Sequence, residues 1–92
     1  MYTQGKWIAR INEIGIDVVE EKTGFGIVDL GNEKILNDCD YPIEEAKANA
    51  NLIAAAPDLL EFAQEMARRY PNSPWIHEQA NVAINRALGN EA

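Results

Sequence analysis

The spacing of apolar residues changes once along the chain, from a period of two to a period near 3.6, and this change separates a strand-rich front from a helical back. Between Lys6 and Leu36 apolar and polar residues alternate, interrupted by turn residues. The predicted strands are 7–11, 16–20, 25–30 and a short segment at 33–36, with turns at 12–15, 22–24 and 31–32. The pattern predicts an antiparallel meander of three or four strands within residues 5–36. Such a sheet can face water on one side and pack helices on the other.

The helical period begins after the polar joint Asn37–Asp40. Asp38 or Asp40 is the expected cap of the first helix, with Pro42 in its first turn. Its apolar stripe consists of small and medium side chains at three- and four-residue spacing: Ile43, Ala46, Ala50 and Ile53. This stripe predicts that the helix packs closely across the sheet.

Pro57 interrupts the helical pattern and predicts that one helix ends or bends there and a second begins. The expected buried stripe of the second helix is Leu59, Ala63, Met66, Ala67 and Tyr70, broadened by Leu60 and Phe62. A third helix is predicted from a cap at Ser73 to about Leu88, before Gly89. Trp75, in its first turn, is expected to cover the end of the core, with an exposed recognition aromatic as the alternative.

These elements predict an α+β fold in which two to three C-terminal helices pack a small N-terminal antiparallel sheet. The 92 residues are expected to form a single domain, 1–92, with the meander in 5–36 and a helical layer in 42–88 that breaks at Pro57. No apolar run approaches the roughly 20 residues needed to cross a bilayer, and the first residues lack the apolar core of a secretory signal. We therefore expect a cytoplasmic protein with no membrane contact.

The charge is concentrated in the front half of the chain. Residues 1–45 carry ten acidic and four basic side chains, a balance of −6, whereas residues 46–92 carry five and four, a balance of −1. A surface of this sign repels phosphate backbones, so direct nucleic-acid binding is not expected. The excess is explained either by solubility or by a surface that binds a Lys/Arg-rich site on a partner. In the second interpretation the predicted partner-binding residues are Asp17, Glu20, Glu21, Asp29 and Glu33.

Reactive chemistry is sparse in this sequence. His77 is the only histidine and Cys39 the only cysteine, which excludes an intrachain disulfide and a zinc site built from several thiolates. We expect Cys39 to be a buried or partly buried structural thiol. The spacing of glycines does not match a phosphate-binding loop. The sequence therefore predicts no catalytic residue, no metal site and no cofactor, and favours a binding protein over an enzyme.

Residues Glu44–Ala67, EEAKANANLIAAAPDLLEFAQEMA, carry a recognisable signature. This segment resembles a module of small phage and prophage accessory proteins, in which an "ANAxLIAAAPxLLE" helix pair follows a short sheet that begins with glycine–x–tryptophan. Ala48–Glu61 matches the helical signature and Gly5-Lys6-Trp7 matches the start. Phe62-Ala63 departs from the more frequent alanine–leucine. The resemblance implies phage origin across nearly the whole chain and transfers no catalytic residue.

Small acidic phage proteins without enzymatic activity often act against host defences, and the length and charge of this chain resemble those of anti-CRISPR inhibitors. The leading hypothesis is an inhibitor that binds a Lys/Arg-rich surface of a host CRISPR effector complex, of type I, and blocks target-DNA binding. One alternative is a sponge that sequesters a nucleotide signal, with Arg68, Arg69 or Lys22 lining its site. Another is a structural or accessory phage protein whose helices pair with a partner, which an exposed apolar strip on the last helix would favour. The sequence leaves the oligomeric state open.

Overall fold

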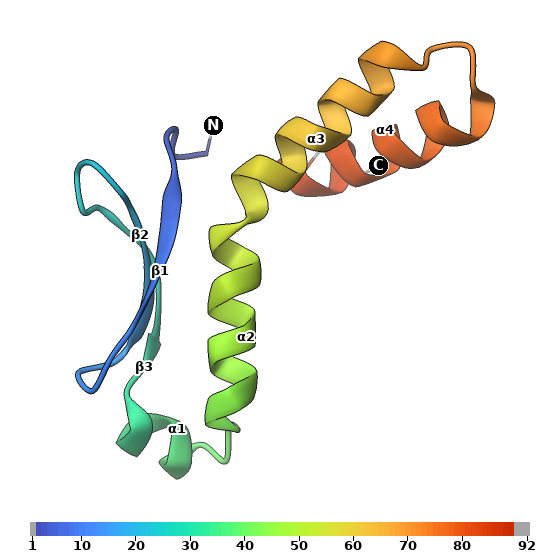
Figure 1. The fold of residues 1–92 in the computed structure, drawn as a ribbon. Helices are drawn as coiled ribbons and strands as arrows, with labels where there is room; N and C mark the ends of the chain where they lie inside the picture. The colour runs from blue at the N-terminus through green and yellow to red at the C-terminus, as the bar shows by residue number, and fades with distance from the viewer. Residues whose placement is uncertain (1, 90–92) are drawn as a thin grey trace. The chain divides into compact units, whose positions relative to one another are not determined.

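A computed structural model describes residues 2–89 as a small three-stranded sheet followed by helices, which confirms the predicted α+β class. The chain falls into two compact units that join at Pro57 and Asp58. The N-terminal unit, residues 2–57, contains the sheet and two helices, and the helical unit, residues 58–89, contains most of a helical hairpin. Figure 1 shows both units.

The sheet is an antiparallel meander with strand order β1-β2-β3. Its strands are β1, Trp7–Ile11, β2, Ile16–Glu20, and β3, Gly26–Gly31. The β1–β2 register is regular, pairing Trp7 with Glu20 and Ile11 with Ile16. The β2–β3 register shifts twice, so that Ile27 and Leu30 are extra residues on β3. Bulges of this kind bend a strand and increase its local twist.

The segment considered as a fourth strand is a short helix, α1, Glu33–Asp38. Asn32 caps it, because the Asn32 side chain accepts a hydrogen bond from the Ile35 amide at 2.9 Å. The cap supplies a partner for an amide at the start of a helix, a stabilisation that a strand would not gain. The short apolar run Ile35-Leu36 is compatible with either element, and the preceding asparagine decides in favour of the helix.

Helix α2, Ile43–Ala54, covers one face of the sheet and contacts β1 and β2 (Figure 1). Ala46 and Ala50 are fully buried, and Ile43 and Ile53 pack against the same core, which confirms the predicted stripe. The methyl side chains let the helix backbone approach the sheet closely. The predicted capping by Asp38 or Asp40 is wrong: Pro42 occupies the cap position, and no side chain caps this helix.

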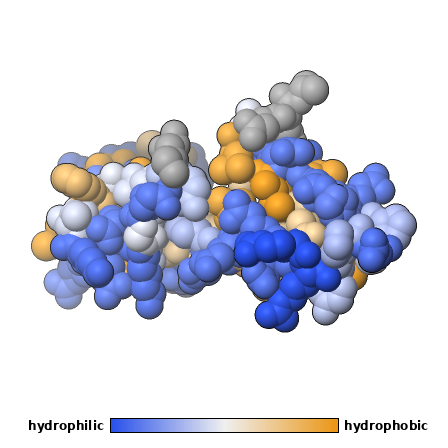
Figure 2. Space-filling model, turned by 90° about the horizontal axis from the view of Figure 1, so that it is seen from above, coloured by the Kyte–Doolittle hydropathy of each residue, from blue (hydrophilic) through white to orange (hydrophobic). Residues whose placement is uncertain are grey.

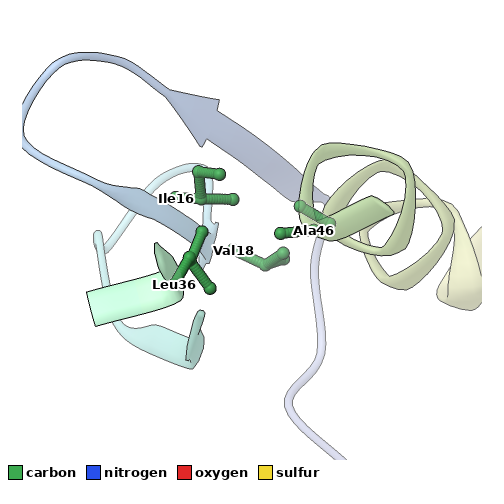
Figure 3. Close-up of a cluster of buried hydrophobic side chains, with 5 residues drawn as sticks. Ile16, Val18, Leu36 and Ala46 are labelled. Carbon is green, nitrogen blue, oxygen red and sulfur yellow. The ribbon is translucent and has the colours of Figure 1, made fainter. Parts of the chain in front are cut away.

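The core of the N-terminal unit lies between the sheet, α1 and α2. Its buried members are Ile16, Val18, Leu36, Ala46 and Ala50. Figure 3 shows Ile16 and Val18 from β2 lying near Leu36 from α1 and Ala46 from α2. Val18 is completely buried and Leu36 is 4% exposed. Leu36 is the buried residue of a helix of six residues, so its contacts hold α1 against the rest of the unit.

The helical hairpin consists of α3, Ala56–Arg69, and α4, Pro74–Leu88, joined by residues 70–73. Pro57 is the second residue of α3, where a missing amide hydrogen is tolerated. Ser73 occupies the cap position of α4, and Gly89 ends α4 in the left-handed conformation, with φ of 72°. The predicted limits of the last helix are therefore confirmed. Among residues 2–89, no helix has the length and apolar character that a membrane span requires.

The predicted buried stripe of α3 is only partly correct. Leu60 is buried, whereas Leu59 is 52% exposed and Phe62 is 63% exposed. Tyr70 is exposed as well. The apolar face of α3 is wider than the surface that covers it, and sequence spacing alone does not identify the covered side. Trp75 is 71% exposed, so its expected role as a cover for the core is wrong.

Candidate functional site

The meander distributes the predicted partner-binding residues between opposite ends of the sheet. The β1–β2 turn, 12–15, lies at the same end as the last residues of β3 and the start of α1, because consecutive strands reverse direction. Asp17, Asp29 and Glu33 belong to this end. Glu20 and Glu21 follow β2 to the other end, where the Glu21 amide donates to the Lys6 carbonyl. The five residues therefore do not form one surface.

Asp17 lies on the open face of the sheet, because Ile16 and Val18 on either side of it point into the core. The Arg10 guanidinium binds both Asp17 carboxylate oxygens, at 2.9 and 2.7 Å. These hydrogen bonds lower the pKa of Asp17. The structure thus assigns Asp17 a partner within its own chain, and the pair neutralises part of this face.

Asp29 is the cross-strand neighbour of Asp17, so that Arg10, Asp17 and Asp29 lie side by side across the three strands. Two carboxylates directly opposite each other repel, and the Arg10 fork offsets this repulsion on the Asp17 side. Asp29 is exposed and accepts a hydrogen bond from the Gly31 amide at 2.8 Å. One uncompensated negative charge therefore remains on the open face.

Shallow hollows surround this end of the sheet. One of about 180 Å³ is lined by Asp17 and Asp29 together with residues of the β1–β2 turn. A more open hollow is lined by Glu13, Glu33 and Asp38 with Lys34. We call the five carboxylates of these two hollows the acidic end: Glu13, Asp17, Asp29, Glu33 and Asp38. The first hollow is smaller than the roughly 300–1,000 Å³ of typical ligand pockets. The second, about 580 Å³, falls within that range but is open to solvent, so the acidic end is more suitable for surface contact than for enclosing a ligand.

Glu20 has a structural role in this fold. Its side chain is buried, 6% exposed, and accepts hydrogen bonds from the Lys22 amide at 2.8 Å and from the Thr23 amide and hydroxyl at 3.1 and 3.0 Å. The Lys22 amide is the main cause of its lowered pKa. Glu20 therefore organises the β2–β3 turn from inside, and it is not accessible to a partner. Glu21, by contrast, is exposed.

The candidate reactive groups, Cys39 and His77, are both exposed to solvent. Cys39, the residue after α1, is exposed, so the expectation of a buried thiol is wrong. His77 is exposed on α4. Within residues 2–89, no group of three or more histidine, cysteine or carboxylate side chains is arranged to hold a metal ion.

Two of the three cationic residues considered for a nucleotide site are paired with one carboxylate of their own helix. Arg68 and Arg69 both pair with Glu65, at 3.4 and 2.8 Å, on the exposed side of α3. Lys22 belongs to the N-terminal unit, whereas both arginines belong to the helical unit. The hydrogen bond from Arg69 lowers the pKa of Glu65. These arginines are already matched by a carboxylate of their own helix.

Sequence reasoning missed Glu13 and Asp38 as members of the acidic end. The signal that identifies Glu13 is topological: in a meander, the first turn and the end of the third strand share one end of the sheet. The same rule separates Glu20 and Glu21 from the other predicted residues. To identify Asp38 as a member of the acidic end, one must know that residues 33–38 form a helix. An extended segment would carry the Asp38 side chain farther from Glu33.

Comparison with known proteins places this chain among phage proteins. No match was found among curated proteins or among solved structures. The family model described as Salmonella phage P22 protein Y8K6 matches residues 1–91, nearly the whole chain. This coverage supports the resemblance to small phage proteins drawn from the helical signature. The chain belongs to the Salmonella phage P22 protein Y8K6 family.

Proposed function

We propose that this phage protein acts by binding the Lys/Arg-rich surface of a host-defence complex in the host cytoplasm, without catalysis. The observation that carries the proposal is the acidic end, where Glu13, Glu33 and Asp38 line one open hollow and Asp29 lies exposed nearby. The described N-terminal unit, residues 2–57, carries ten acidic and five basic side chains. A net charge of −5 steers a protein toward a cationic partner and away from nucleic acid.

The target we propose is a CRISPR effector complex of type I. RNA-guided effectors hold their nucleic acids in a positively charged channel, and an acidic protein bound there would compete with target DNA. The proposed contact residues are exposed carboxylates of the acidic end, and they differ from the sequence-based set by including Glu13 and leaving out Glu21, which lies at the other end of the sheet. Glu20 is buried and Asp17 is paired with Arg10, so we assign the contact to Glu13, Asp29 and Glu33.

The test measures target-DNA binding by a purified effector complex with and without added protein. Wild type should lower DNA affinity and co-elute with the complex. The variant Glu13→Lys/Glu33→Lys should lose most of this effect, by about tenfold or more in affinity, which corresponds to about 1.4 kcal/mol. The matched control is Glu61→Lys/Glu78→Lys, which changes the net charge equally but lies in the helical unit. The control should inhibit as wild type does.

Two results would reject parts of this proposal separately. Unchanged DNA affinity together with no co-elution would exclude the CRISPR complex as the target, and a pull-down from host lysate would then search for another. Equal inhibition by the acidic-end variant and wild type would exclude the acidic end as the contact surface. Raised ionic strength provides an independent check, because it should slow association if exposed charges steer the encounter.

A second candidate is a phage accessory protein whose helices pair with another phage protein. The observation in its favour is the exposure of Trp75 and Val82, which lie seven residues apart on α4 and are 71% and 49% exposed. Trp75→Ala should then abolish capture of that protein while the acidic-end variant retains it. The nucleotide sponge is less favoured, because Arg68 and Arg69 pair with Glu65. A thermal shift with cyclic nucleotides would revive it.

A further inference from the structure

The helical unit has little core of its own. Residues 58–89 form 32 residues of chain, and within this described range only Leu60 and Ala80 are buried. Units below about 40 residues usually need disulfides, metals or association to remain folded. Cys39, the single cysteine, lies outside the unit. The hairpin therefore needs apolar surface from elsewhere, and its own exposed residues indicate where.

Helix α3 carries an uncovered apolar seam. Its apolar face is split: Leu60 is buried and Ala63 and Ala67 are half-buried, whereas Leu59 and Phe62 are more than half exposed. At about 100° per residue, Leu59, Phe62 and the half-buried Met66 fall within an arc of about 60°. Apolar residues at this three- and four-residue spacing form the contact surface when two helices pair in a coiled coil. Figure 2 shows hydrophobic residues gathered on the surface of the helical unit.

The charges beside this seam are self-complementary. Asp58 and Arg69 stand near opposite ends of α3, and at about 100° per residue they lie about 20° apart on one flank of the seam. In a two-fold antiparallel pair of identical helices, each flank meets the same flank of the other copy. Asp58 of each copy then approaches Arg69 of the other, whose guanidinium also binds Glu65 of its own helix at 2.8 Å. A guanidinium has several N–H donors and can bind both carboxylates. The helical unit carries four acidic and three basic side chains in residues 58–89, so repulsion between two copies is small.

We propose that the protein forms a homodimer in which the α3 helices of two copies pair antiparallel through Leu59, Phe62 and Met66. The occupant of the seam is thus a second copy of this chain. The argument rests on three observations: the small buried core, the seam spacing and the opposed charges at the two ends of one flank. It is independent of the acidic end, which belongs to the other unit and carries a net charge that opposes self-association.

The test is the mass of the protein in solution, measured by sedimentation equilibrium over a wide range of concentration in reducing buffer. Reducing conditions remove any contribution from a disulfide at exposed Cys39. Wild type should approach the mass of two chains as concentration rises. Phe62→Glu should shift the protein to the mass of one chain. Ile14→Glu, at a side chain 87% exposed in the N-terminal unit, is the matched control and should dimerise as wild type does.

Charge reversal tests the antiparallel arrangement and does not depend on the Phe62 variant remaining folded. Asp58→Arg should weaken the dimer at least several-fold, because each new arginine faces Arg69 of the other copy. Adding Arg69→Asp to Asp58→Arg should restore dimerisation. Wild type with the mass of one chain at every concentration would overturn the proposal and leave the seam to the N-terminal unit or a foreign partner. A dimer unaffected by both Phe62→Glu and Asp58→Arg would overturn the proposed interface.

Discussion

Replacing Leu36 by alanine tests whether the short helix α1 is held in place by a single side chain. Leu36 is 4% exposed and packs with Ile16, Val18, Ala46 and Ala50. The substitution removes three carbon atoms from this cluster. It does not disfavour the helix itself, because alanine has the highest helix propensity. The loss therefore reports the packing of the side chain and not the propensity of the helix.

The expected cost follows from the atoms removed. At about 0.8 kcal/mol for each buried methylene equivalent, transfer alone accounts for about 2.4 kcal/mol. A residual cavity adds to this term, so we expect a total of about 3–4 kcal/mol, within the range of roughly 2–5 kcal/mol for buried leucines. A chain of 92 residues has a free energy of unfolding of about 5–14 kcal/mol. The substitution should remove a large share of it.

Urea unfolding followed by tryptophan fluorescence measures this cost. The chain has two tryptophans, and Trp75 is exposed in the helical unit, so a Trp75→Phe background leaves half-buried Trp7 as the reporter of the N-terminal unit. The matched control is Ile35→Ala in the same helix, which removes the same number of atoms from a side chain 52% exposed. The control should lose about 1 kcal/mol or less.

The difference in unfolding free energy between the two variants shows whether Leu36 anchors α1. Leu36→Ala should be less stable than Ile35→Ala by about 2 kcal/mol or more. Equal losses, or a loss below about 1 kcal/mol for Leu36→Ala, would refute the assignment of Leu36 as the anchor of α1. Such a result would mean that α1 contributes little to the core, and that its place beside the sheet is maintained by the chain connections alone.

Three further predictions concern the sheet and α2. Gly5→Ala should lower the free energy of unfolding in urea by more than Gly24→Ala. Both glycines have positive φ, but a β-carbon at Gly5 would lie 3.0 Å from a Glu20 carboxylate oxygen, whereas one at Gly24 would meet open space. Equal losses would exclude this contact. Because hydrogen bonds lower the pKa of Glu20, its contribution to stability is present above pH 4.5 and is lost as pH falls further. The free energy of unfolding of Glu20→Gln should therefore fall less steeply than that of wild type between neutral and acid pH. Identical pH profiles of the two proteins would contradict this. Ala50→Leu should cost about 1–3 kcal/mol by overpacking, while Ala48→Leu on the exposed side of α2 should be nearly neutral, as calorimetry would reveal.

The sequence predicted elements well wherever periodicity and local turn chemistry agreed. The strand limits follow from alternation between turns, and the last helix follows from Ser73 before it and Gly89 after it. Residues 33–36 were ambiguous because a short apolar run fits both a strand and a helix. The side-chain bond from Asn32 that decides between them depends on backbone geometry. Element type was thus predictable except where one capping hydrogen bond determined it.

The candidate site was less predictable, because composition does not specify which side chains meet. Glu20 and Glu21 are adjacent in sequence, yet one is buried inside a turn and the other is exposed. Asp17 is one of the predicted partner-binding residues, and the cross-strand register places Arg10 beside it as a partner within its own chain. The buried stripe predicted for α3 was only partly correct for a similar reason. The apolar arc of this helix is wider than the surface that packs on it, so tertiary contacts decide which of its apolar residues are buried.

The two bulges in β3 have a consequence for the solution behaviour of this protein. A three-stranded meander leaves its outer strands with unpaired backbone groups, and a flat outer strand is a template on which other chains polymerise. In β3 the extra residues Ile27 and Leu30 disturb the regular ladder, and the charged Asp29 stands between them. This edge is therefore a poor template for fibril growth, which favours a protein that stays dispersed in solution.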